Sequence, residues 1–226
     1  MNIKNNITQF SKKLPPGVTL VAVSKMQPIE NLKEAYEAGQ RIFGENKVQE
    51  MREKFSLLPP DIQWHMIGHV QTNKVKYIIP FVHLIHSVDS IKLLLEIEKQ
   101  ATKNNRIISC LLQVHIAEED SKFGFDEKDI RELITFPLWK DLKHIKIKGL
   151  MGMATFTPQQ DQIRKEFRKL KTLFDELKEQ TLPLQVQMEE LSMGMTGDYR
   201  IALEEGSTMI RIGTALFGIR DDLGPK

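Results

Sequence analysis

The sequence has almost no cysteine: Cys110 is the single one among 226 residues. One thiol cannot form an intramolecular disulfide, so a disulfide-stabilised secreted scaffold is excluded and a reducing compartment is indicated. Cys110 lies in the apolar run 107–114, and a cysteine in such a run is typically a buried packing residue. We therefore expect an unreactive thiol and no redox centre.

The sequence also lacks a strong charge bias and a long hydrophobic run. The net charge is +2 at pH 7, which does not indicate a nucleic acid or another polyanion as partner. No apolar stretch is long enough to cross a bilayer, and residues 1–13 lack the apolar core of a signal peptide. These absences predict a cytoplasmic protein without a membrane or nucleic-acid partner.

Metal-binding motifs are absent as well. The six histidines include no HExxH pair, and no cysteine stands at zinc-ligand spacing from any of them. A buried, hydrogen-bonded histidine is commoner than a metal ligand, so we expect no metal site.

What the sequence does contain is a regular alternation of short apolar runs and longer charged segments of helical period. The strand-like runs are 19–24, 41–43, 62–67, 83–88, 107–116, 145–149, 184–191 and 208–212. The helical segments between them are 29–38, 47–55, 72–79, 91–103, 127–135, 161–179 and 198–205. Residues 3–14 form a further amphipathic helix before the first strand.

Such alternation predicts parallel strands joined by right-handed crossovers. Eight units of about 28 residues fit a compact (β/α)₈ TIM barrel. We expect one such barrel over residues 1–226, with the extra N-terminal helix, as a single domain. A doubly wound open sheet is the alternative that periodicity alone does not exclude.

The most informative single residue is Lys25, which follows the first apolar run directly. The carboxyl ends of parallel strands carry the chemistry of these folds. A lysine held against an apolar wall can lose its proton and attack a carbonyl to form a Schiff base. The alternative is an ordinary solvated lysine, since most lysines are exposed.

The last two units indicate an anion site. Residues 191–198 leave the seventh strand through glycines, and Thr196 precedes the next helix. Gly213 and Thr214 leave the eighth strand in the same way. Hydroxyls and backbone N–H groups at such positions can hold a phosphate, although ordinary helix capping explains them equally well.

These two features come together in a barrel, because its first and eighth strands are neighbours. Lys25 would then lie beside the phosphate site formed by Thr196, Gly213 and Thr214. An imine-forming lysine next to a phosphate cradle suggests pyridoxal phosphate as cofactor. It equally suggests a Schiff-base aldolase that acts on a sugar phosphate.

Six motifs occur in order along the chain. They are 21–25 (VAVSK), 43–46 (FGEN), 64–68 (WHMIG), 71–74 (QTNK), 191–195 (LSMGM) and 211–218 (RIGTALFG). By these motifs the sequence resembles the pyridoxal phosphate homeostasis protein family over essentially its whole length. Members of that family resemble the N-terminal barrel of alanine racemase and bind pyridoxal 5'-phosphate as an aldimine.

The resemblance implies a role for each matching residue. Lys25 matches the lysine of the aldimine, and Arg211 matches the arginine that faces the pyridine nitrogen. Contacts with the phosphate are implied for Thr196, Gly213 and Thr214, and positions lining the pocket for Asn46, Met66, Ser87 and Ser192. No role follows for His69 or Lys122.

The resemblance further implies buffering or delivery of the cofactor, without an established catalytic activity. A guanidinium keeps its proton, and protonating a ring nitrogen about 3 Å away would cost about 5 kcal/mol at an effective dielectric near 20. The ring would then be a weak electron sink. The alternatives are a low-activity racemase or lyase, the aldolase, and a partner-binding scaffold. Pyridoxal phosphate-dependent apoenzymes are the expected recipients, and we expect a monomer because no sequence follows residue 226 to build a second racemase domain.

Overall fold

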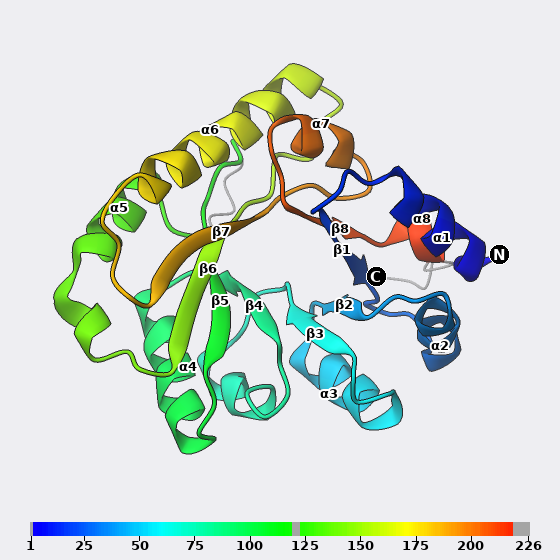
Figure 1. The fold of residues 1–226 in the computed structure, drawn as a ribbon, viewed down its shortest axis with the longest axis horizontal. Coiled ribbons are helices and arrows are strands. Elements are labelled where there is room, and N and C mark those ends of the chain that lie inside the picture. The colour runs from blue at the N-terminus through cyan, green and yellow to red at the C-terminus, as the bar shows by residue number, and fades with distance from the viewer. Residues whose placement is uncertain (1, 119–122, 219–226) are drawn as a thin grey trace.

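The apolar runs form eight parallel strands that close into a barrel, with helices around the outside (Figure 1). A computed structural model describes residues 2–118 and 123–218. The strands are β1 (Thr19–Val23), β2 (Ile42–Glu45), β3 (Gln63–Met66), β4 (Leu84–Val88), β5 (Ile108–Gln113), β6 (Ile145–Met151), β7 (Val186–Ser192) and β8 (Met209–Ile212). β1 pairs in parallel with β8, from Thr19 opposite Met209 to Ala22 opposite Ile212. This closure confirms the predicted TIM barrel and excludes the open sheet.

Helices follow the strands along the chain. They are α2 (Ile29–Glu37), α3 (Val48–Leu57), η1 (Thr72–Tyr77), α4 (Ile91–Lys103), α5 (Glu127–Thr135), η2 (Pro137–Lys140), α6 (Gln160–Lys178), α7 (Tyr199–Glu204) and α8 (Thr214–Phe217). The expected extra helix, α1 (Ile3–Lys13), begins at Asn2, whose side chain accepts from the Asn5 N–H at 2.8 Å. It packs beside α2 and α8 (Figure 1).

Several boundaries differ from the predicted ones. Residues 72–77 form a short 3₁₀ helix, η1, in place of the helix predicted over 72–79, and Val75 is its buried side chain. Strand β6 continues past Gly149, which has φ +149° at a shift in strand register. A Cβ there would lie 1.9 Å from the Glu190 carbonyl oxygen, so the glycine lets the strands approach.

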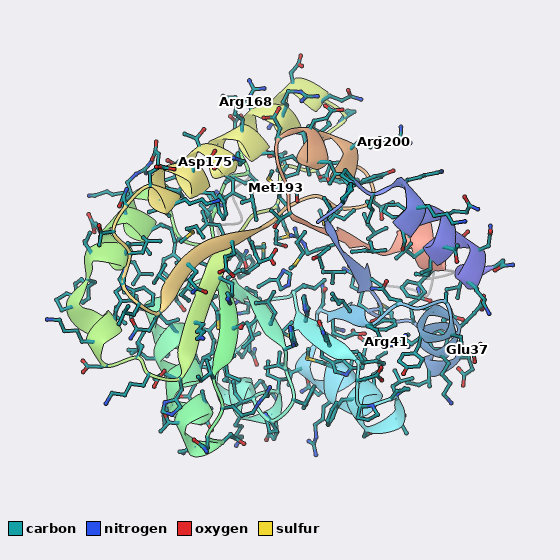
Figure 2. The ribbon with its side chains drawn as sticks, in the orientation of Figure 1. Glu37, Arg41, Arg168, Asp175, Met193 and Arg200 are labelled. Carbon is teal, nitrogen blue, oxygen red and sulfur yellow. The ribbon has the colours of Figure 1, made fainter. Side chains whose placement is uncertain are left out.

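The core has two layers, because side chains alternate between the faces of each strand. Outward-facing residues pack under the helices in one large cluster. A smaller cluster of Val21, Leu84, Leu111, Met151 and Met209 fills the inside of the barrel. In Figure 2, side chains occupy both spaces, whereas Arg168 and Asp175 on α6 are exposed at the outer surface.

The structure also bears on the single cysteine and on the expected lack of a membrane span. Cys110 is fully buried, which confirms the predicted packing residue, and burial raises the pKa of its thiol. Among the helices of residues 2–118 and 123–218, none is long and apolar enough to cross a membrane.

Candidate functional site

A cavity of about 340 Å³ lies at the carboxyl ends of the strands. It is lined by Val23, Lys25, Asn46, Ile67, Met153, Phe156, Met195, Thr196, Gly197, Asp198, Arg211, Gly213 and Thr214. Six of the nine predicted site residues are in this wall. In particular, Lys25 shares one cavity with the three residues expected to hold a phosphate.

Lys25 is presented by a tight turn after β1. The Gln27 N–H donates to the Ser24 carbonyl at 3.0 Å, which places Lys25 and Met26 at the centre of the turn. Met26 has φ +61°, an uncommon conformation for a residue with a side chain. The Met26 N–H donates to the Glu50 carboxylate, and the Lys54 ammonium donates to the Ser24 carbonyl at 2.6 Å. Helix α3 therefore holds this strained turn at its first residue and at its centre.

The brace behind Lys25 is a buried ionic cluster. Lys54 Nζ lies 2.8 Å from Glu45 Oε1 and 2.6 Å from Glu50 Oε1, and Ser24 Oγ donates to Glu45 Oε1 at 2.6 Å. Burial raises the pKa of Glu45, although Lys54 and Ser24 oppose that shift. Glu45 Oε2 has no partner among the described residues. Lys54 is held in this cluster, whereas Lys25 lines the cavity.

Asn46 is placed by a close approach of two loops. A Cβ on Gly68 would lie 2.5 Å from the Asn46 carbonyl oxygen and 2.7 Å from its Cα. The Gly68 carbonyl in turn accepts from Ser87 Oγ at 2.6 Å. Ser87 is fully buried, so it supports the cavity wall from behind instead of lining it.

Arg211 is the buried cation of the site, with 3% of its surface exposed. Its Nη1 donates to Ser192 Oγ at 2.7 Å and its Nη2 to the Gly152 carbonyl at 3.0 Å. Burial lowers the pKa of Arg211 to about 10, so it stays charged at neutral pH. Ser192 therefore contributes by anchoring Arg211 and does not line the cavity.

The residues predicted to hold the phosphate lie between each strand and the start of the next helix, and these helices are short. The helices that follow β7 and β8 have six and four residues, and so few peptide units form a weak dipole. The hydroxyls of Thr196 and Thr214 line the cavity and make no hydrogen bond to a described residue. Gly213 lies against β1, where a Cβ would be 3.3 Å from the Val23 carbonyl oxygen.

Asp198 is a cavity residue that sequence reasoning missed. Its Oδ1 accepts the Met195 N–H at 2.5 Å, which closes the loop that carries Thr196. Burial raises the pKa of Asp198, while Arg211 acts in the opposite direction. The carboxylate thus shapes the loop and partly balances the buried guanidinium.

Met66 does not line the cavity, although the family resemblance implied that it would. It is fully buried in the outer layer of the core, whereas its neighbour Ile67 lines the cavity. Successive side chains of a strand point to opposite faces, so Met66 and Ile67 cannot both face the cavity. Following this alternation along β3 would have identified Ile67. Phe156, Met153 and Met195 were also missed, because apolar loop residues carry no sequence signal for a binding wall.

Two further positions lie outside the cavity wall or outside the described chain. His69 Nδ1 is 2.7 Å from Asp89 Oδ2, and its ring lies 5.2 Å from that of Phe123. Lys122 is outside the described residues. Within the described part of the chain, no group of three or more potential ligands is arranged to hold a metal ion.

Residues 1–221 match the model of the alanine racemase N-terminal domain family. The pyridoxal phosphate homeostasis protein of Aquifex aeolicus is 42% identical over 202 residues, which are 89% of this chain and 86% of that protein. The corresponding protein of Pasteurella multocida is 37% identical over 97% of this chain and 94% of its own length.

Solved structures also match this chain over nearly its whole length. PipY of Synechococcus elongatus, determined with PLP bound, superposes with a TM-score of 0.85 at 37% identity, covering 96% of this chain and all of that one. Alanine racemase of E. faecalis has a TM-score of 0.76 at 18% identity. This chain covers 58% of the racemase while 97% of its own length is matched, so the likeness concerns the fold of the barrel.

Proposed function

Because the chain belongs to the alanine racemase N-terminal domain family, we propose that it binds pyridoxal 5'-phosphate in this cavity and serves the homeostasis of that cofactor. Its relatives of 36–42% identity are pyridoxal phosphate homeostasis proteins, and PipY has been solved with PLP bound. In this role the protein would buffer the concentration of free cofactor or deliver the cofactor to other proteins.

The observation that carries the proposal is that one cavity of about 340 Å³ holds an amine, a buried guanidinium and two hydroxyls. Lys25 supplies the amine and Arg211 the guanidinium, while Thr196 and Thr214 supply the hydroxyls. Pyridoxal phosphate carries an aldehyde, a ring nitrogen and a phosphate, each of which has a chemical counterpart in this set.

We assign the contacts accordingly. Lys25 would hold the cofactor through a Schiff base between its amine and the aldehyde, with the carbonyl oxygen lost as water. Thr196, Gly213 and Thr214 contact the phosphate, since hydroxyls and a glycine backbone allow close approach of its oxygens. Arg211 donates to the ring nitrogen and Asn46 forms part of the wall. Ser192 anchors Arg211 and Ser87 holds the Gly68 carbonyl beside Asn46, whereas Met66 lies in the outer layer of the core.

We infer a single domain over residues 1–226 that acts as a cytoplasmic monomer and passes the cofactor to pyridoxal phosphate-dependent apoenzymes. A charged Arg211 beside the ring nitrogen favours holding the cofactor over using it, because an unprotonated ring withdraws electrons weakly.

Replacing the amine tests the proposal. Wild type mixed with pyridoxal phosphate is expected to develop the visible absorbance of a Schiff base, and borohydride reduction should label the peptide that contains Lys25. Lys25→Ala should lose both signals. The exposed α2 residue Lys33 gives the matched control, and Lys33→Ala should behave as wild type. A label on another lysine, or an unchanged band in Lys25→Ala, would remove Lys25 from this role.

A further inference from the structure

A continuous chain of four polar side chains crosses the inside of the barrel behind the candidate site. Arg211 Nη1 donates to Ser192 Oγ at 2.7 Å, and Ser192 Oγ lies 3.0 Å from His86 Nδ1. His86 Nε2 lies 2.9 Å from His65 Nδ1. None of the four is more than 3% exposed. They come from β8, β7, β4 and β3, and connect strands that are not all neighbours in the barrel.

The single hydroxyl proton of Ser192 decides the direction of this chain. Ser192 Oγ accepts from Arg211, and His86 Nδ1 is its one other partner among the described residues. With Ser192 donating to His86 Nδ1, one buried group of the chain, His65 Nε2, lacks a partner among the described residues, whereas the reverse direction would also leave the Ser192 proton without an acceptor. We therefore assign Ser192 as the donor to His86 Nδ1. This places the ring proton of a neutral His86 on Nε2, from which it is donated to His65 Nδ1. His65 then carries its own proton on Nε2.

Both histidines are neutral in the folded protein. Burial lowers the pKa of His65 to about 3, and burial, His65 and the charge of Arg211 hold the pKa of His86 well below its ordinary value. With one proton on each ring, the hydrogen bonds all run the same way, from Arg211 towards His65. Bonds aligned in one direction polarise and strengthen one another.

We propose that Ser192, His86 and His65 form a directed hydrogen-bond relay that positions Arg211 for the ring nitrogen of the bound cofactor. This inference rests on the proposed function and adds His86 and His65 as positioning residues. The relay works because the His86 acceptor holds the Ser192 proton away, which keeps the Ser192 lone pairs turned towards Arg211. With Nη1 held by Ser192 and Nη2 by the Gly152 carbonyl at 3.0 Å, the guanidinium has one orientation in the cavity wall.

The far end of the relay reaches the opposite end of the barrel. His65 Nε2 has no partner among the described residues. The ring of His65 stacks on that of His83 with centroids 5.6 Å apart, and both line a cavity of about 260 Å³ at the amino ends of the strands. Neither His86 nor His65 lines the proposed cofactor cavity, so any effect of these histidines on the cofactor passes through Arg211.

Two substitutions of His86 separate the relay from simple packing. His86→Leu removes both the acceptor and the donor, whereas His86→Gln keeps a carbonyl for Ser192 and an N–H for His65. Loss of one partner from a buried network of this kind is expected to weaken cofactor binding about tenfold. In His86→Leu we also expect a changed pH profile of the bound cofactor's absorbance, and in His86→Gln recovery of most of both properties.

The control is Ile85→Ala, a buried change on the outward face of the same strand. It should lower stability while leaving cofactor affinity and absorbance unchanged. Wild-type affinity and an unchanged pH profile in His86→Leu would overturn the relay, as would a glutamine variant no better than the leucine variant.

A measurement on the unliganded wild type keeps the inference testable if His86→Leu does not fold. Nitrogen-15 NMR of labelled histidines should find Nε2 protonated and Nδ1 unprotonated in both His86 and His65. Protonation of His86 on Nδ1 would contradict the relay directly. Failure of the wild type to bind pyridoxal phosphate would instead refute the proposed function, since the NMR result does not depend on the cofactor.

Discussion

At the scale of single residues, the site depends on positions where a side chain has no room. Gly68 is the clearest case, because its missing Cβ lets the loop after β3 touch the backbone of Asn46. The motif WHMIG placed a glycine there, yet nothing in the sequence indicates which backbone it meets. Met26 shows the reverse, as a residue with a side chain held at φ +61° by groups from α3.

Gly68→Ala is expected to lower the free energy of unfolding by about 1–3 kcal/mol, the usual range for overpacking. The added methyl group would meet main-chain atoms of Asn46, which cannot rotate away as a flexible side chain would. We also expect weaker pyridoxal phosphate binding, since Asn46 lines the cavity. Urea denaturation and a cofactor titration measure the two effects.

Gly197→Ala provides the control for stability. A Cβ at Gly197 would have no atom within 4 Å, and its backbone is not left-handed. Its free energy of unfolding should equal that of the wild type. Equal stability of the Gly68 variant would show that the loops move apart without cost.

At the scale of elements, helix α3 fixes the turn after β1. The sequence predicts the helix and the strand but gives no sign that Lys54 is buried between them. Lys54 and Glu50 stand four residues apart and resemble an ordinary surface pair. Packing of α3 against the barrel instead puts Lys54 against Glu45 and the Ser24 carbonyl, with 6% of its side chain exposed.

Lys54→Met should therefore cost about 3–5 kcal/mol of stability, because it leaves buried carboxylates without their cation. The double variant Glu45→Gln with Lys54→Met should recover much of that loss, since the orphaned charge is then absent. Chemical denaturation of the three proteins gives the comparison. A single variant as stable as the wild type would mean that the cluster does not hold α3 to the turn.

At the scale of the whole molecule, the polar chain through the barrel links stability to pH. The folded state keeps His65 and His86 unprotonated, with the pKa of His65 at about 3 against an ordinary value of 6.5. The unfolded chain binds protons on both below about pH 6.5, so stability must fall as the pH falls from there. Glu45 and Asp198 have raised pKa values and act in the opposite direction, which offsets part of the loss.

We expect each histidine to remove up to about 1.4 kcal/mol per pH unit below its ordinary pKa. Urea denaturation between about pH 7 and pH 5 measures this slope. In His86→Gln, the free energy of unfolding should change less steeply with pH, because one of the two titrating histidines is absent. A slope in His86→Gln equal to that of the wild type would show that His86 is not held neutral.

The sequence by itself predicted the eight-unit barrel, the extra helix and six of the thirteen residues that line the cavity. Strand and helix periodicity, glycines and hydroxyls after strands, and Lys25 at a strand end are local features that single residues carry. Asn46 and Arg211 were predicted from the motifs shared with the family. Only the tertiary structure decided that Lys54 is a buried brace, and that Arg211 is joined to His65 through Ser192 and His86. Those facts depend on which strands become neighbours around a closed barrel and on which side chains lose their water there, and residues from 65 to 211 meet only when the chain has folded.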